Sequence, residues 1–289
     1  IEELFLRNLF FEHFITKTMN IPELFKKMKS IQINLINFIE NDDDMEEKYQ
    51  NLTGKIKDEQ IFKDRDKFKL FIQLLSNVIK NHNRVNNFLA KIQKILIFIK
   101  DEIKQTFSNY EIFDFFKNNK IILLFLIKEN IITIDKRIVD IITTDKFKLR
   151  KYPEYFYKEI KPFIGNDMNE IIVSDDYENN RKKGENENYL CQLIREDSID
   201  QFITYVNRND LYLQKQIKMS IYETNSLMMH KQLTLLDYTF FYGSLQIVKY
   251  LLSRGEKLTE SLWIFAIHSD NAEIIQLLED ESLSPKNDE

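Results

Sequence analysis

The sequence predicts an all-α protein, and three observations support this fold class. The 289 residues include only 5 Gly and 4 Pro, too few for the many tight turns of a β-sandwich or β-barrel. Hydrophobic residues make up 43% of the chain, which is enough for a sizeable core. In long stretches they recur every three or four residues, the spacing that places side chains on one face of a helix.

Residues 4–40 are expected to form two helices, with Pro22 in the first turn of the second, where its missing N–H costs nothing. Apolar residues follow at alternating spacings of three and four, namely Ile21, Leu24, Met28, Ile31, Leu35 and Phe38. This heptad seam covers under three heptads, so a partner helix in the same chain is favoured over an intermolecular coiled coil. An acidic run from Asp42 to Glu47 comes next, and we expect a solvated linker over residues 41–60.

The helical period returns from residue 66. One stripe contains Phe68, Phe71, Ile72, Leu75 and Ile79, and the next contains Val85, Phe88, Leu89, Ile92, Leu96, Ile99 and Ile103, with a turn over 81–83 between them. Shorter helices are expected over 111–117, 121–129, 136–142 and 155–160. Helices joined by connections this short pack antiparallel with their neighbours, which predicts an array of helical hairpins.

The apolar period fades into a polar, charged stretch after Gly165, so we place a linker over 175–188. Two domains are therefore expected, a helical domain over 1–174 that contains the acidic linker and a second domain over 189–289.

Composition narrows the classes of partner. A net charge of -5 offers no electrostatic drive toward nucleic acid. The longest run of apolar residues, Ile121 to Ile127, is well short of the roughly 20 residues that span a bilayer. Cys191 is the single cysteine and cannot close an intrachain disulfide, which favours a reducing, cytoplasmic location and a buried, apolar role for its side chain.

Motifs for catalysis or metal binding are missing from the sequence. The histidines stand apart, at His13, His82, His230 and His268, so no compact set of zinc ligands is present. Five scattered glycines cannot build a phosphate-binding loop. We therefore expect no metal, no cofactor and no enzymatic activity; an enzyme would need a site assembled from dispersed residues.

The most specific pattern lies near the C-terminus. It consists of Thr234, Leu236, Asp237, Thr239, Gly243, Val248, Leu251, Leu252 and Gly255. Thr234 with Asp237 forms a capping-box start, and the two glycines suit the left-handed backbone after each of two helices. At these offsets the sequence resembles one ankyrin repeat, with Leu235 and Asp237 departing from the family's Pro and His.

A second copy follows about 27 residues later, with Ala266 aligned to Thr239, Ile275 aligned to Val248 and Leu278 in its second helix. A weaker upstream copy runs from Leu193 to Val206, with Asp197 at its turn. Beyond about residue 66 the chain resembles a family of protist ankyrin proteins in which a helical domain of unknown function precedes the repeats. The resemblance implies a short ankyrin-repeat solenoid over 189–289, which we expect to be truncated at its C-terminus.

The same resemblance implies a noncatalytic protein-protein interaction module, an adaptor or scaffold that binds an unidentified protein. The sequence leaves its oligomeric state open, and we favour a monomer. It places partner contacts at the two positions before each interhelix turn, which are Arg195, Glu196, Phe241, Tyr242, His268 and Ser269. Phe241 and Tyr242 are the first candidates, as exposed aromatic residues; their burial against residues 207–233 or the helical domain is the open alternative. The rival function is a structural scaffold that self-associates through the seam of residues 21–38.

Overall fold

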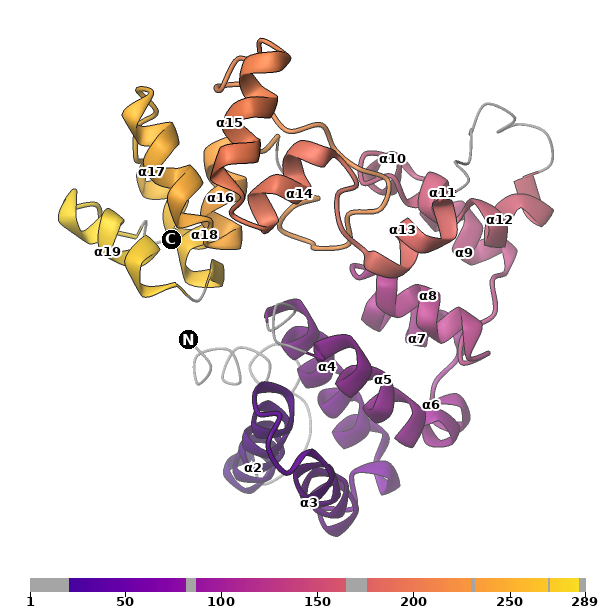
Figure 1. Ribbon diagram of the computed structural model, residues 1–289. Helices are drawn as coiled ribbons and strands as arrows, with labels where there is room; N and C mark the ends of the chain where they lie inside the picture. The colour runs from indigo at the N-terminus through magenta and orange to yellow at the C-terminus, as the bar shows by residue number, and fades with distance from the viewer. Residues whose placement is uncertain (1–20, 82–86, 165–175, 230–231, 270, 286–289) are drawn as a thin grey trace. The chain divides into compact units, whose positions relative to one another are not determined.

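The computed structural model describes residues 21–81, 87–164, 176–229, 232–269 and 271–285. Within these ranges the chain is helical and contains no strand (Figure 1). The β-type pairing there is an isolated antiparallel bridge between Gln216 and Thr234. The predicted all-α class is confirmed for the described part of the chain. No helix in these ranges has both the length and the apolar character that crossing a membrane requires.

The chain divides into two compact units between Ile138 and Val139, a point that lies within α9 (Lys136–Ile142). The helices before α9 are α2 (Ile21–Glu40), α3 (Met45–Asp58), η1 (Ile61–Lys63), α4 (Arg65–Asn81), α5 (Phe88–Phe98), α6 (Lys100–Thr106), α7 (Asn109–Phe116) and α8 (Lys120–Lys128). Those after it are α10 (Asp145–Lys148), α11 (Tyr152–Tyr155), α12 (Tyr157–Ile164), α13 (Tyr177–Lys183), α14 (Tyr189–Arg195), α15 (Ile199–Arg208), α16 (Leu235–Tyr242), α17 (Leu245–Ser253), η2 (Glu260–Leu262), α18 (Trp263–Ser269) and α19 (Ala272–Asp280).

The predicted seam of α2 is buried inside the first unit. Its described side chains, Leu24, Met28, Ile31, Leu35 and Phe38, are at most 4% exposed. Helix α2 packs against α3, α4 and α5 of the same chain. The partner helix is therefore intramolecular, as the short length of the heptad pattern predicted.

The acidic linker expected over 41–60 is wrong for most of its length, because α3 occupies residues 45–58. Leu52 and Ile56 lie four residues apart on α3 and are fully buried, with Thr53 beside them. Glu46 and Glu47 occupy the first turn, where the positive end of the helix dipole stabilises carboxylates. The acidic run thus lies at the start of α3, and the buried apolar stripe of α3 packs against α2.

The stripe of residues 68–79 is confirmed as the buried face of α4. The following stripe is divided between α5 and α6, which meet at Ile99. Val85 and most of the turn expected at 81–83 lie outside the described residues, and so does the first helix expected within 4–20.

The linker expected over 175–188 contains α13, and the division between units falls far upstream of it. Arg181 of α13 is completely buried. Its guanidinium pairs with Glu159 at 2.7 Å and lies over the rings of Tyr155 and Tyr177 at 5.3 and 5.0 Å. This buried cation joins α13 to α11 and α12, a connection between distant residues that local composition does not reveal.

Helices α14 to α19 of the second unit form three helix pairs, α14–α15, α16–α17 and α18–α19. The first helix of the middle pair, α16, packs against both α14 and α18 (Figure 1). A shared core runs through the pairs and includes Leu193, Phe240 and Ala266. Each pair therefore completes the core of its neighbour.

Candidate functional site

The turns of the first two helix pairs have matching geometry. Asp197 has φ 45° and Gly243 has φ 69°, both in the left-handed region. The next residue in each case, Ser198 or Ser244, is the N-cap of the second helix. Asn271 is the corresponding N-cap of α19. These three N-caps give a common register for the pairs.

Gly243 meets two demands at its turn. Its φ is one that residues with a Cβ seldom adopt. A Cβ built there would also lie 3.3 Å from Cβ of Asn271, in the next turn. The expected left-handed roles of Gly243 and Gly255 are confirmed, since Gly255 has φ 98°.

Hydrogen bonds join successive turns. The carboxylate of Asp197 accepts from the backbone N–H groups of Gln246 and Ile247 in α17, at 3.0 and 3.1 Å. Ser244 donates its hydroxyl to the carbonyl of Ile194, at 2.5 Å. Asn271 donates from Nδ2 to the carbonyl of Gly243, at 3.2 Å. We call these bonds the turn bridges; because each turn is tied to the next one, they fix the stacking of the three pairs.

The predicted start of the middle pair is confirmed. Thr234 is the N-cap of α16 and its hydroxyl accepts from the backbone N–H of Asp237, at 3.1 Å. The carboxylate of Asp237 accepts in return from the backbone N–H of Thr234, at 3.0 Å. Leu236, Thr239, Val248 and Leu251 are buried on this pair, Leu252 is partly buried, and Ala266, Ile275 and Leu278 continue the pattern on the last pair.

Arg195, the first predicted contact residue, is largely enclosed, with 15% of its side chain exposed. Its Nη1 donates to the carbonyl of Asn186 and to the hydroxyl of Tyr238, both at 2.9 Å. Its Nε lies 3.1 Å from a carboxylate oxygen of Glu185. Arg195 therefore holds α14 against α16.

Phe241 is 1% exposed, so the expectation that it is an exposed aromatic contact is wrong. Its ring packs against Tyr242 at 5.1 Å and against His268 of α18 at 5.9 Å. Ser269 is also buried, at 7% exposure. Phe241 and Ser269 lie where α16 packs against α18. The alternative of burial is therefore correct for Phe241, but α18 covers its ring, and not residues 207–233 or the helical domain.

The remaining predicted positions reach the surface and define a contact strip of Glu196, Tyr242 and His268. Glu196 is exposed, and Tyr242 and His268 are partly exposed. Tyr242 stacks on Tyr238 with ring centroids 4.6 Å apart. Burial raises the pKa of both tyrosines, so both remain neutral phenols at physiological pH. The strip thus presents the carboxylate of Glu196 and the partly exposed side chains of Tyr242 and His268 from three successive pairs, and Tyr242 rests on the buried rings of Tyr238 and Phe241.

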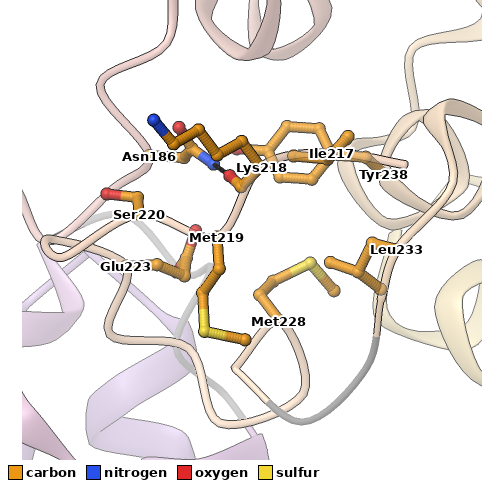
Figure 2. A pocket seen from close by; sticks show the side chains of 9 residues that line it. All are labelled: Asn186, Ile217, Lys218, Met219, Ser220, Glu223, Met228, Leu233 and Tyr238. Atoms are coloured by element: carbon orange, nitrogen blue, oxygen red, sulfur yellow. Dashed lines mark hydrogen bonds between the residues drawn. The ribbon is translucent and has the colours of Figure 1, made fainter. Parts of the chain in front are cut away.

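A small cavity lies under the connection between α15 and α16 (Figure 2). Asn186, Ser220, Glu223 and Tyr238 bring polar atoms to it, and Met219 and Met228 line its apolar side. Its volume of about 20 Å³ is close to that of one water molecule, far below the roughly 300–1,000 Å³ of sites for small organic ligands. Sequence reasoning missed this group because most of its members come from the irregular segment between α15 and α16, which carries no motif.

We next consider metal binding and thiol reactivity in the described ranges. They hold no group of three or more His, Cys, Asp or Glu placed to share a metal ion; His13, His82 and His230 lie outside them. Cys191 is buried, which confirms the expected apolar role. Burial raises the pKa of its thiol to about 12, so it remains protonated at physiological pH.

Comparison of the chain with protein-family models, with curated proteins and with solved structures finds no match. The chain's own residues therefore carry the functional inference.

Proposed function

We propose that the chain is a noncatalytic protein-binding module in which stacked, ankyrin-type helix pairs present the contact strip to a partner protein. The observation that carries this proposal is the set of turn bridges, which join the turns of successive helix pairs. Asp197, Ser244 and Asn271 each bond to the backbone of a neighbouring pair. Stacking of similar helix pairs on their neighbours is typical of repeat proteins, which use the surfaces of their stacked helices for recognition.

A rigid support favours recognition by the strip. Tyr242 rests on Tyr238 and Phe241, and both supporting rings are 1% exposed. A partner that binds Tyr242 therefore meets a side chain whose rotamer is already fixed, which reduces the entropy lost on association. Tyrosine also provides a large contact area together with a hydrogen-bonding group, which is why it is common among residues that dominate interfaces.

The self-associating scaffold is the weaker candidate. It requires Leu24 and Leu35 of α2 to contact a second copy, but both face the interior of the first unit, at 4% and 0% exposure. The described side chains of the seam are covered by α3, α4 and α5 and leave no apolar surface for another chain.

The function is tested by capture from native lysate on immobilised protein, followed by mass spectrometry. Glu196→Arg and Tyr242→Ser alter the strip, and Gln201→Arg on α15 is the control because its side chain is also exposed. We expect the wild type and the control to capture the same protein, and both strip variants to lose it. Circular dichroism melts verify that each variant is folded. A captured set that is identical for all four proteins, or that matches bare beads, contradicts the proposed function.

A further inference from the structure

The last helix pair exposes large apolar side chains on one side. Ile267 is 54% exposed and Ile264 is 42% exposed, both on α18. They lie three residues apart and therefore share a helix face. Ile275 of α19 is partly buried, and Glu279, one turn further along that helix, is exposed. We call these four residues the end face.

The shared register shows what happens at the equivalent positions of the earlier pairs. Four residues before the N-cap of the second helix stand Ile194, Phe240 and Ile267 in the three pairs; the first two are 0% exposed, and Ile267 is 54% exposed. Both buried residues belong to the core that the stacked pairs share.

The second helices repeat the pattern. Four residues after the N-cap stand Phe202, Val248 and Ile275, of which the first two are 0% exposed and the third is partly exposed. Ile267 and Ile275 of the end face therefore occupy stacking positions of the repeat that are left uncovered in the described chain.

One position distinguishes the end face from the covered surfaces. Eight residues after the N-cap, the earlier pairs have Val206 and Leu252, whereas the last pair has Glu279. At the equivalent positions Val206 is buried and Leu252 is partly buried, so a further pair with an apolar partner at that point would bury part of the Glu279 side chain without a counter-charge, which is costly. A second copy meeting end to end would bring two Glu279 residues together, with Asp280 and Glu281 adding like charge.

From these observations we propose that the end face docks an amphipathic helix of another protein, whose apolar stripe covers Ile264, Ile267 and Ile275 and whose Lys or Arg pairs with Glu279. Apolar anchors at helical spacing with a complementary charge beside them are the general basis of helix-in-groove recognition. This inference rests on the proposed protein-binding role but uses a surface separate from the contact strip.

Trp263 provides a direct readout of binding. It is the single tryptophan of the chain, it precedes Ile264, and its indole Nε1 donates to the carbonyl of Leu283 at 3.1 Å. The probe is a synthetic, tryptophan-free helical peptide with Leu on one face and Lys beside it. A sibling peptide carries Glu in place of every Lys. We expect the Lys peptide to bind the wild-type protein saturably and to shift Trp263 emission, and the Glu peptide to bind at least tenfold more weakly.

Variants locate the binding site. Ile267→Ser should weaken binding of the Lys peptide at least tenfold, and Glu279→Gln should weaken it severalfold. Ile33→Ser is the matched control, because Ile33 is 59% exposed on α2, and it should bind as the wild type does. Glu196→Arg on the contact strip should also bind the Lys peptide normally. A wrong assignment of the contact strip and a wrong assignment of the end face therefore give different results.

Three results would each overturn the proposal. They are absence of saturable binding to the wild type, equal binding of the two peptides, and unchanged binding by Ile267→Ser. Light scattering supplies a further check. A wild-type dimer that Ile267→Ser converts to a monomer would make a second copy the occupant and would likewise reject the proposal.

Discussion

The carboxylate of Asp197, in the turn between α14 and α15, accepts a hydrogen bond from the backbone N–H of Ile247 in α17, 50 residues further along the chain. The N–H groups in the first turn of a helix have no partner within that helix. Asp197 satisfies two of them from the neighbouring pair, because Gln246 donates to its other oxygen. A single side chain thus caps one helix and joins two pairs.

We expect Asp197→Ala to lower the free energy of unfolding by about 1–2 kcal/mol, since a helix cap is lost and Ala tolerates left-handed φ less well. Asp197→Asn should cost less, because its amide oxygen still accepts one bond and Asn adopts left-handed φ readily. Urea unfolding followed by circular dichroism measures both values. Equal stability of Asp197→Ala and wild type would show that the bond between these pairs contributes little.

Two glycines should respond to alanine in opposite directions. Gly243→Ala combines a φ of 69° with a Cβ placed 3.3 Å from Asn271, and we expect a loss of about 1–3 kcal/mol. Gly54 lies within α3, and a Cβ there has nothing within 4 Å. Gly54→Ala should therefore stabilise the protein by about 0.5–1 kcal/mol. Thermal melts of the two variants should shift in opposite directions, and a shift of the same sign would contradict the assigned backbone at Gly243.

Lys91 of α5 is a buried cation that caps the C-terminal end of α2: its Nζ donates to the carbonyls of Ile39 and Asn41 at 2.7 and 3.1 Å and pairs with the carboxylate of Asp42 at 2.7 Å. Lys91→Met should cost about 1–3 kcal/mol, because a buried carbonyl loses its charged donor. Lys94, also on α5, pairs with Glu46 at the surface. Lys94→Met should therefore lower the free energy of unfolding by at most about 0.5 kcal/mol. Urea titrations compare the two, and similar losses would contradict a capping role for Lys91.

Phe241→Ala should destabilise the second unit by about 3–5 kcal/mol, as expected when a buried aromatic side chain leaves a cavity. Tyr242→Ser, at a partly exposed position, should cost less. Calorimetric melts of the two variants provide the comparison. If Phe241→Ala left the melt unchanged, the ring would not belong to the core.

Cys191 links pH to stability through its thiol. Its pKa is raised to about 12 in the folded chain, above the value near 8.5 of a free thiol. The folded state keeps its proton while the unfolded state releases it, so this contribution is complete below about pH 8.5 and is lost as pH rises toward 12. Cys191→Ala should unfold with a smaller loss of stability over that range. A thiol reagent at pH 8 should react with one group per chain only after unfolding; fast reaction of native protein would contradict the burial.

Local patterns predicted the parts of this fold that depend on neighbours in sequence. Examples are the apolar stripe of α4, the apolar seam of α2 and the capping box of Thr234 and Asp237. Each of these patterns can be recognised from residues within one helix or one turn. The same reasoning failed for residues 45–58, where charge composition concealed a helix with Leu52 and Ile56 buried. It also failed for α13, where the burial of Arg181 depends on Glu159 and two aromatic rings.

The candidate site divides in the same way. The resemblance to ankyrin repeats implied the six candidate positions before the interhelix turns, but it could not say which of the six remain at the surface. The sequence by itself determined helix periodicity, caps and left-handed turns, because these depend on φ, ψ and hydrogen bonds within a few residues. Only the tertiary structure decided that Phe241 is covered, that Tyr242 is partly exposed and that Ile267 is open, because exposure depends on whether another helix lies over a given face.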